Sequence, residues 1–266
     1  MQQNNLMGLT LGGGAAKGIS ILGIIEEIEK LDLNIGYISG TSIGAIIGAY
    51  YALYGEVSSL KKEIFSLKKI DILRFADFNK LPHKSLIKAD HYKKFLRKIF
   101  EDKEFSDTKI PLIITTTNLT NGEIVYIEKG NIFDALIASS AYPGIFPPYV
   151  DNKNEVYVDG GVLDNLPYNI LLKKGLTKII VVNLYLHSRN KKNKNLLSVI
   201  SNSIDLMMGT AYHGLEIKDK RLFFIQPNFK KSFGSIWDFS DLKIKYLVGV
   251  TEFQKRKKEL LNWLNT

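Results

Sequence analysis

The first fifth of the chain repeats a pattern that few folds can accommodate, in which an apolar run ends at a glycine-rich turn and a helix follows. Residues 6–11 form such a run and predict a buried strand. Residues 19–31 place isoleucine and leucine at helical spacing among charged residues, which predicts an amphipathic helix. A short strand at 37–39 and a buried helix at 43–54 follow. Strands that alternate with helices in this way favour an α/β fold with a mostly parallel sheet.

The same alternation continues towards the carboxyl terminus, so we expect a three-layer α/β/α sandwich built as a single domain over residues 1–266. Residues 56–105 have the pattern of a helical, lysine-rich insertion or cap interrupted at Pro82, and residues 190–266 that of a helical extension of the same domain. The other expected strands are 110–117, 123–127, 156–158, 178–186 and 221–226, and the other expected helices are 132–140, 165–174, 196–215 and 242–264.

Composition excludes several classes of protein. The chain contains no cysteine, which rules out a disulfide framework, a cysteine nucleophile and a thiolate zinc site. The first residues are polar and uncharged, without the basic segment and long apolar segment of a signal peptide. No apolar run reaches the roughly 18 residues of a membrane-spanning helix. We therefore expect a soluble cytoplasmic protein.

The net charge of +9 allows two interpretations. The excess lysines and arginines lie in small clusters, which are typical of solvated helix faces. Alternatively, they attract the protein to an anionic surface. No zinc finger, RNA-recognition motif or basic helical repeat favours nucleic acid, so peripheral contact with an anionic membrane is the expected form of this alternative. The stretch 229–239, with aromatic residues beside Lys230 and Lys231, is a candidate for that contact.

A candidate nucleophile lies at the turn between the second strand and the second helix. Gly40-Thr41-Ser42-Ile43-Gly44 matches the pattern G-x-S-x-G, and its position between a strand and a helix is the context that gives the pattern meaning. Gly40 and Gly44 leave room for neighbouring backbone, so the Ser42 hydroxyl projects outward. The amino end of the following helix favours negative charge at the same place. We expect Ser42 to be a nucleophile.

The turn after the first strand reads Gly12-Gly13-Gly14-Ala15-Ala16-Lys17-Gly18. Glycines let backbone N–H groups converge on an anion at a helix amino terminus. The spacing departs from the dinucleotide pattern G-x-G-x-x-G, no acidic residue ends the second strand, and Lys17 is not followed by the serine or threonine of a P-loop. An oxyanion hole formed by the loop Gly12–Ala15 remains the best interpretation.

A candidate base follows the strand at 156–158. Asp159-Gly160-Gly161 is by itself an ordinary turn sequence, but a serine nucleophile needs a proton acceptor. The four histidines (His83, His91, His187 and His213) lie in polar, lysine-rich or helical surroundings that do not suggest a base. An aspartate held at a strand end could serve instead, so Asp159 is the expected base. A histidine-dependent α/β-hydrolase stays open as an alternative.

These motifs, in this order, resemble the patatin-like phospholipase family, specifically its small bacterial members. The glycine loop, the serine turn and Asp159-Gly160-Gly161 all match, and residues 138–147 and 164–167 are similar to the family's sequence on either side of the aspartate. The likeness covers about residues 6–185. Lys17 occupies a position where the family often has arginine or lysine, whereas Ala15 replaces a common glycine.

The resemblance implies a Ser42–Asp159 dyad without histidine and a lipid or lysophospholipid acyl ester as substrate. It implies an oxyanion hole from backbone N–H groups near Gly13 and Gly14. No metal or other cofactor is expected. The alternative is a regulatory or interaction protein that keeps the fold without effective turnover. Neither acyl-chain preference nor oligomeric state follows from the sequence.

Overall fold

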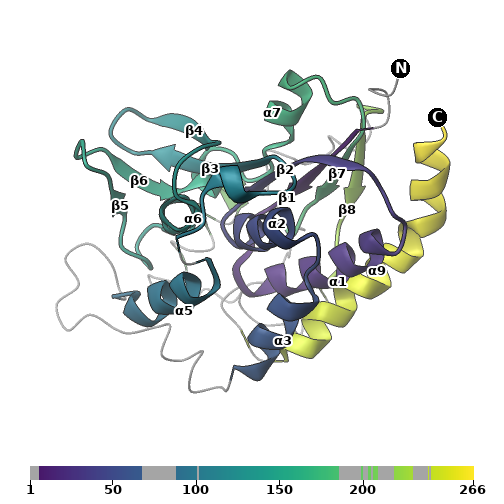
Figure 1. Cartoon of the computed structure of the whole chain (residues 1–266), viewed down its shortest axis with the longest axis horizontal. Coiled ribbons are helices and arrows are strands. Elements are labelled where there is room, and N and C mark those ends of the chain that lie inside the picture. The colour runs from purple at the N-terminus through teal and green to yellow at the C-terminus, as the bar shows by residue number, and fades with distance from the viewer. Residues whose placement is uncertain are drawn as a thin grey trace.

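Figure 1 shows the course of the chain in a computed structural model, which describes residues 6–67, 88–100, 102–185, 199, 203–204, 206–208, 219–229, 239 and 241–266. The strands are β1 (Met7–Leu11), β2 (Ile35–Thr41), β3 (Leu112–Asn118), β4 (Glu123–Ile127), β5 (Tyr149–Val150), β6 (Val156–Asp159), β7 (Ile179–Val182) and β8 (Leu222–Ile225). The α-helices are α1 (Ile19–Glu29), α2 (Ile43–Tyr54), α3 (Ser58–Ser66), α5 (Asp90–Phe100), α6 (Ile132–Ser139), α7 (Tyr168–Lys173) and α9 (Leu242–Leu264). Short 3₁₀ turns are η2 (Ala15–Gly18), η3 (Phe105–Asp107) and η4 (Gly160–Val162).

The strands form one eight-stranded sheet in the order β5-β6-β3-β2-β1-β7-β8, with β4 also paired to β3. Five neighbouring strands are parallel to one another: β3, β2, β1, β7 and β8. The strands β4, β6 and β5 join by antiparallel pairing. The predicted mostly parallel α/β sheet is therefore confirmed, with an antiparallel wing at one edge.

Helices cover both faces of the sheet, which explains why the central strands β1 and β7 are buried along their whole length. Ile114 and Val182 face the larger core, which they share with α1, α2, α6 and α9. Their neighbours Ile113 and Val181 face the smaller core, together with Leu171 of α7. In Figure 1 the helix α7 lies across the sheet from α1 and α9.

The expected insertion contributes to the same core as the rest of the molecule. Leu60 and Ile64 of α3 and Leu96 and Phe100 of α5 are buried within the larger core. These two helices are thus continuous with the main hydrophobic core, while the segment 68–87, with Pro82, lies outside the described residues.

Most predicted elements occur with shifted ends. The helices at 43–54 and 242–264 and the strand at 123–127 have the predicted bounds. The helix expected at 165–174 begins only at Tyr168, because Asn165 bonds to Gly13 of the glycine loop and Pro167 bonds to Ser39 of β2. The two-residue strand β5 was not predicted. The helix expected at 196–215 and the aromatic stretch 229–239 fall largely outside the described residues.

Candidate functional site

Ser42 occupies a strained turn between β2 and α2. Its backbone has φ of 55° and ψ of −125°, a conformation that residues other than glycine rarely adopt. Its N–H donates to Ser139 Oγ at 2.9 Å, and its carbonyl accepts from the Ile46 N–H at 3.1 Å. Both backbone groups are therefore held in place, and the side chain lies at the amino end of the twelve-residue helix α2.

Close backbone approach explains the two glycines around Ser42. A Cβ atom added to Gly44 would lie 2.6 Å from the Gly12 carbonyl oxygen and would also collide with the Leu11 carbonyl. A Cβ atom added to Gly40 would lie 2.8 Å from the Ala45 nitrogen. A larger residue at Gly44 would therefore push the serine turn away from β1, and one at Gly40 would push β2 away from the start of α2.

The sheet brings Asp159 to Ser42. Thr41, the last residue of β2, pairs with Thr115 of β3, and the next residue, Thr116, pairs with Asp159 of β6. The two candidate residues therefore flank the same point of β3. The Asp159 carboxylate accepts a hydrogen bond from the Gly161 N–H at 2.8 Å, and the Ser42 side chain lies close enough to it to influence the pKa of Asp159.

The environment of Asp159 makes its carboxylate a stronger base than usual. The residue is 1% exposed, and burial raises the pKa of Asp159 to about 6. The Ser42 side chain and the hydrogen bond from Gly161 lower this pKa and offset only part of the burial effect. The carboxylate is still ionised at neutral pH, so it can accept a proton there.

The four oxyanion-hole candidates fall into two pairs. The Gly12 N–H donates to the Val182 carbonyl at 3.0 Å, and the Gly13 N–H donates to Asn165 Oδ1 at 3.1 Å. In the described part of the chain, the N–H groups of Gly14 and Ala15 have no acceptor. Of the four candidates, Gly12 and Gly13 thus hold the loop in place, and Gly14 and Ala15 are the two whose N–H groups are not used by the described part of the chain.

The loop lies against the serine turn. A Cβ atom added to Gly13 would lie 3.2 Å from Ser42 Cβ, so there is no room for a side chain between them. Ala15 adopts a φ of 46°, which turns the chain into η2. A Cβ atom on Gly18 would lie within 3 Å of the Ile43 side chain, and Gly18 thereby lets η2 pack on the start of α2.

Lys17 is held beside aromatic rings. Its Nζ lies 5.9 Å from the ring centroid of Tyr185 and 5.5 Å from that of Phe229, distances at which a cation is attracted to the ring face. Its carbonyl accepts a hydrogen bond from the Ser20 hydroxyl at 2.7 Å. Lys17 thus stabilises the loop from the side of β7.

Two further groups reach the site that the motifs did not single out. Ser139 Oγ accepts the hydrogen bond from the Ser42 N–H. Ser139 lies in the segment 138–147, to which the sequence motifs assigned no role. Tyr92 of α5 donates to Ser140 Oγ at 2.8 Å, and burial together with the charge of Asp159 raises the pKa of Tyr92. The insertion therefore reaches the site, although nothing in its lysine-rich sequence indicates this.

The histidine alternative is only partly covered by the described residues. His91 lies in α5, whereas His83, His187 and His213 lie outside the described part of the chain. Among the described residues no group of three or more His, Asp or Glu could hold a metal ion. In the same part of the chain no helix is long and apolar enough to cross a bilayer.

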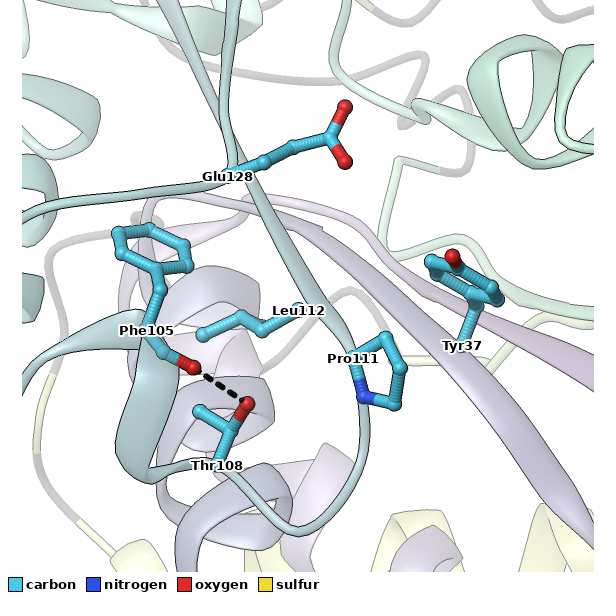
Figure 2. Close-up of a pocket in the computed structure, with 6 residues that line it drawn as sticks. All are labelled: Tyr37, Phe105, Thr108, Pro111, Leu112 and Glu128. Carbon is cyan, nitrogen blue, oxygen red and sulfur yellow. Dashed lines mark hydrogen bonds between the residues drawn. The ribbon is translucent and has the colours of Figure 1, made fainter.

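A hollow of about 270 Å³ lies at the opposite end of the sheet, away from Ser42. Figure 2 shows the side chains that line it: Tyr37, Phe105, Thr108, Pro111, Leu112 and Glu128. The Thr108 hydroxyl donates to the Phe105 carbonyl at 2.8 Å, and Lys174 forms an ion pair with Glu128 at 2.6 Å. Thr108 and Glu128 thus each have a bonding partner, and none of the lining residues is a serine or an aspartate.

Comparison with known proteins adds to this geometry. The family model described as patatin-like phospholipase matches residues 9–172. Lysophospholipase NTE1 of Scheffersomyces stipitis is 33% identical over 189 residues, which is 68% of this chain but 12% of that protein. Patatin-like phospholipase domain-containing protein 6 of Homo sapiens is 28% identical over 183 residues, 68% of this chain and 13% of that protein. The chain thus spans only a small part of the length of these relatives.

The crystal structure of VipD from Legionella pneumophila has the same fold. Its TM-score is 0.53 at 15% identity, and the match covers 98% of this chain and 67% of that one.

Proposed function

The chain belongs to the patatin-like phospholipase family, and from that premise we propose that it hydrolyses lipid acyl esters with Ser42 as nucleophile and Asp159 as general base. One observation carries the proposal: a serine in a strained turn lies beside a buried carboxylate whose pKa is raised to about 6. A nucleophile next to a base that can take its proton is the expected signature of covalent catalysis. The turn strain and the buried charge both cost stability, which suits a functional site.

The first half of the reaction forms an acyl-enzyme. Ser42 Oγ attacks the ester carbonyl carbon while its proton passes to Asp159, and the carbonyl π electrons move onto the oxygen. The resulting oxyanion is bound by the N–H groups of Gly14 and Ala15 and lies near the amino end of α2. The carbon–oxygen bond to the alcohol then breaks, and that alcohol takes the proton from Asp159.

Water repeats the sequence in the second half. It attacks the acyl carbon while its proton passes to Asp159, and a second oxyanion occupies the same position. The bond between the acyl carbon and Ser42 Oγ breaks, Oγ recovers the proton, and the fatty acid leaves. Both steps need Asp159 as a proton acceptor and then as a donor, and a pKa near 6 suits both roles at neutral pH.

The substrate class rests on the relatives. NTE1 is named a lysophospholipase and the human relative a phospholipase-domain protein, so we assign this chain a lysophospholipid or phospholipid acyl ester as substrate. The net charge of +9 supports peripheral attraction to an anionic membrane, which would bring the protein to such a substrate.

Release of fatty acid from lysophosphatidylcholine tests the proposal. The wild-type protein should release it, and Ser42→Ala should lose at least about 10⁴-fold in kcat. Ser106→Ala is the matched control, because it removes an exposed hydroxyl in η3 and should leave turnover unchanged. Hydrolysis that survives in Ser42→Ala would contradict the proposal, and so would loss of activity when any one of the four histidines is replaced by alanine.

A further inference from the structure

The segment that follows the candidate base threads between the other parts of the site. The Thr41 hydroxyl donates to the Asp164 carbonyl at 3.1 Å, and the Ser39 hydroxyl donates to the Pro167 carbonyl at 2.9 Å. Both donors belong to β2, the strand that leads to Ser42. Asn165 lies between these two anchors and is thereby fixed in place near the serine turn.

The side chain of Asn165 is turned towards the glycine loop. Its Oδ1 accepts the Gly13 N–H at 3.1 Å, and the residue is only 1% exposed. Cβ atoms added to Gly13 and Gly161 would lie 2.7 Å and 2.9 Å from the same Oδ1. One carboxamide oxygen therefore lies between the loop that faces Ser42 and the turn that carries Asp159.

The other half of this carboxamide has no partner. Within the described part of the chain, Asn165 Nδ2 is buried and makes no hydrogen bond. A buried donor without an acceptor lowers stability, and most buried side-chain amides in proteins are bonded at both ends. An asparagine that served the fold alone would not be expected here, so the value of this side chain lies in the contact that Oδ1 makes.

We propose that Asn165 is a positioning residue that fixes the orientation of the oxyanion loop by holding the Gly13 N–H. This inference rests on the proposed function, because it concerns the transition state at Ser42. With the Gly13 amide tied to Asn165, the next two N–H groups, those of Gly14 and Ala15, stay free for the oxyanion. Without the tie, the Gly12–Gly13 peptide can rotate, the next two peptides move with it, and the N–H groups of Gly14 and Ala15 no longer point to one place.

The expected effect is on the rate of reaction and not on the binding of the acyl chain. Small displacements of groups that stabilise a transition state cost about 10²-fold in rate. Asn165→Ala should therefore lower kcat by about this factor and leave KM within about twofold of the wild type. It should also slow the reaction of Ser42 with a fluorophosphonate by about 10²-fold, because the phosphonyl oxygen uses the same N–H groups.

Fluorophosphonate labelling followed by intact mass separates positioning from folding. A positioning role lowers the rate constant of Asn165→Ala while the final stoichiometry stays at one label per chain. Partial unfolding would instead lower the stoichiometry and leave the rate constant of the labelled fraction unchanged, and that result would overturn the proposal. Asn118→Ala is the matched control, since Asn118 Oδ1 also holds a backbone N–H, that of Thr120 at 2.8 Å, but in the β3–β4 turn. Its labelling rate should stay within about twofold of the wild type.

A second variant keeps the acceptor and tests the contact itself. Asn165→Asp retains an oxygen for the Gly13 N–H, so above pH 8 it should label at least about tenfold faster than Asn165→Ala. The added carboxylate repels the charge of Asp159, so its pH–rate curve should rise at a higher pH than that of the wild type. If the aspartate variant is as slow as the alanine variant, Oδ1 does not act as proposed. If the alanine variant does not fold, an aspartate variant that labels about 10²-fold more slowly than the wild type above pH 8 overturns the proposal, because the retained oxygen then fails to hold the loop.

The wild-type protein, labelled in the same experiment, distinguishes the two levels of inference. If the wild-type protein takes no label at Ser42, the proposed function fails, whatever the variants do. If it takes one label at Ser42 and Asn165→Ala labels at the same rate, only the role of Asn165 fails.

Discussion

The two ends of the parallel sheet treat their polar groups differently. At the carboxyl end, Ser42 has a strained backbone, Asp159 is a buried carboxylate with a raised pKa, and Asn165 Nδ2 has no partner among the described residues. At the amino end, Thr108 bonds to a carbonyl and Glu128 to a lysine around an open hollow. The first end contains groups that lower stability, and the second has none among the residues named here.

The hollow and the strained groups thus lie in different places. The side chains that Figure 2 draws around the hollow include Thr108 and Glu128, and each of these has a bonding partner. The carboxyl end has the unsatisfied and strained groups that proteins tolerate where chemistry occurs. Substitutions at the two ends should therefore differ both in the size and in the sign of their effects.

The largest difference is expected from replacing the two acidic side chains by amides. Asp159→Asn removes the base and should lower kcat by about 10³–10⁴-fold. Glu128→Gln removes only an exposed ion pair at the amino end and should leave kcat within about twofold. Steady-state hydrolysis of a chromogenic acyl ester measures both. Equal losses in the two variants would remove the distinction between the ends of the sheet.

The same aspartate should also affect stability, in the opposite direction to activity. Because burial raises the pKa of Asp159 from 3.8 to about 6, the folded protein binds this proton more tightly than the unfolded chain does. Stability contributed by the protonated form is complete below about pH 4 and is lost as the pH rises to about 6. Asp159→Asn cannot ionise, so at pH 7 it should be more stable by up to about 3 kcal/mol. Urea unfolding at pH 7 measures this, and a destabilised asparagine variant would contradict it.

Backbone approach at the serine turn gives the next effect. Gly44→Ala places a Cβ atom against the carbonyls of Leu11 and Gly12, and overpacking against rigid backbone should cost about 1–3 kcal/mol and most of the activity. Gly48→Ala lies one turn later in α2, where the nearest atom is a side-chain carbon of Ile38 at 3.0 Å. It should be close to neutral, since alanine favours the helix. Thermal unfolding compares the pair, and equal losses would show that the clash is not the cause.

The pH dependence is a smaller effect that sharpens the assignment of the base. Since Asp159 accepts a proton only when ionised, kcat/KM should fall about tenfold per pH unit below about pH 6 and level off above it. A curve with its midpoint near pH 4 would mean that the carboxylate is not desolvated during the reaction. Replacing Glu128 by glutamine should not move the midpoint.

The mostly parallel sheet, most of the helices and the order of the motifs could be predicted from the sequence, because they follow from local periodicity and from the positions of glycines. The strand and helix around Ser42 are short-range features, and the α2 helix has the predicted bounds. Pairing between strands could not be predicted in the same way. Asp159 lies opposite Thr116, and hence beside Ser42, because of the register between β3 and β6, and no local sequence pattern specifies that register.

Individual contacts within the site could not be predicted from the sequence, because they too depend on which segments meet in the folded chain. Gly12 and Gly14 look alike in the sequence, but only the strand partner Val182 decides that the amide of Gly12 is occupied. Tyr92 comes from an insertion whose sequence resembles a solvated helix, and its contact with Ser140 exists only in the folded chain. A helix was expected from Asn165 onward. Residues 164–167 instead bond to the glycine loop between β1 and α1 and to β2, and the helix begins only at Tyr168.

Covalent labelling of the wild-type chain tests the central claim most directly. The protein is treated with a fluorophosphonate at pH 8 and digested, and the modified peptide is sequenced by mass spectrometry. The account predicts one label per chain on Ser42, no label in Ser42→Ala, and a rate constant at least about 10³-fold lower in Asp159→Asn. A label on another residue, or an undiminished rate in Asp159→Asn, would contradict the Ser42–Asp159 dyad.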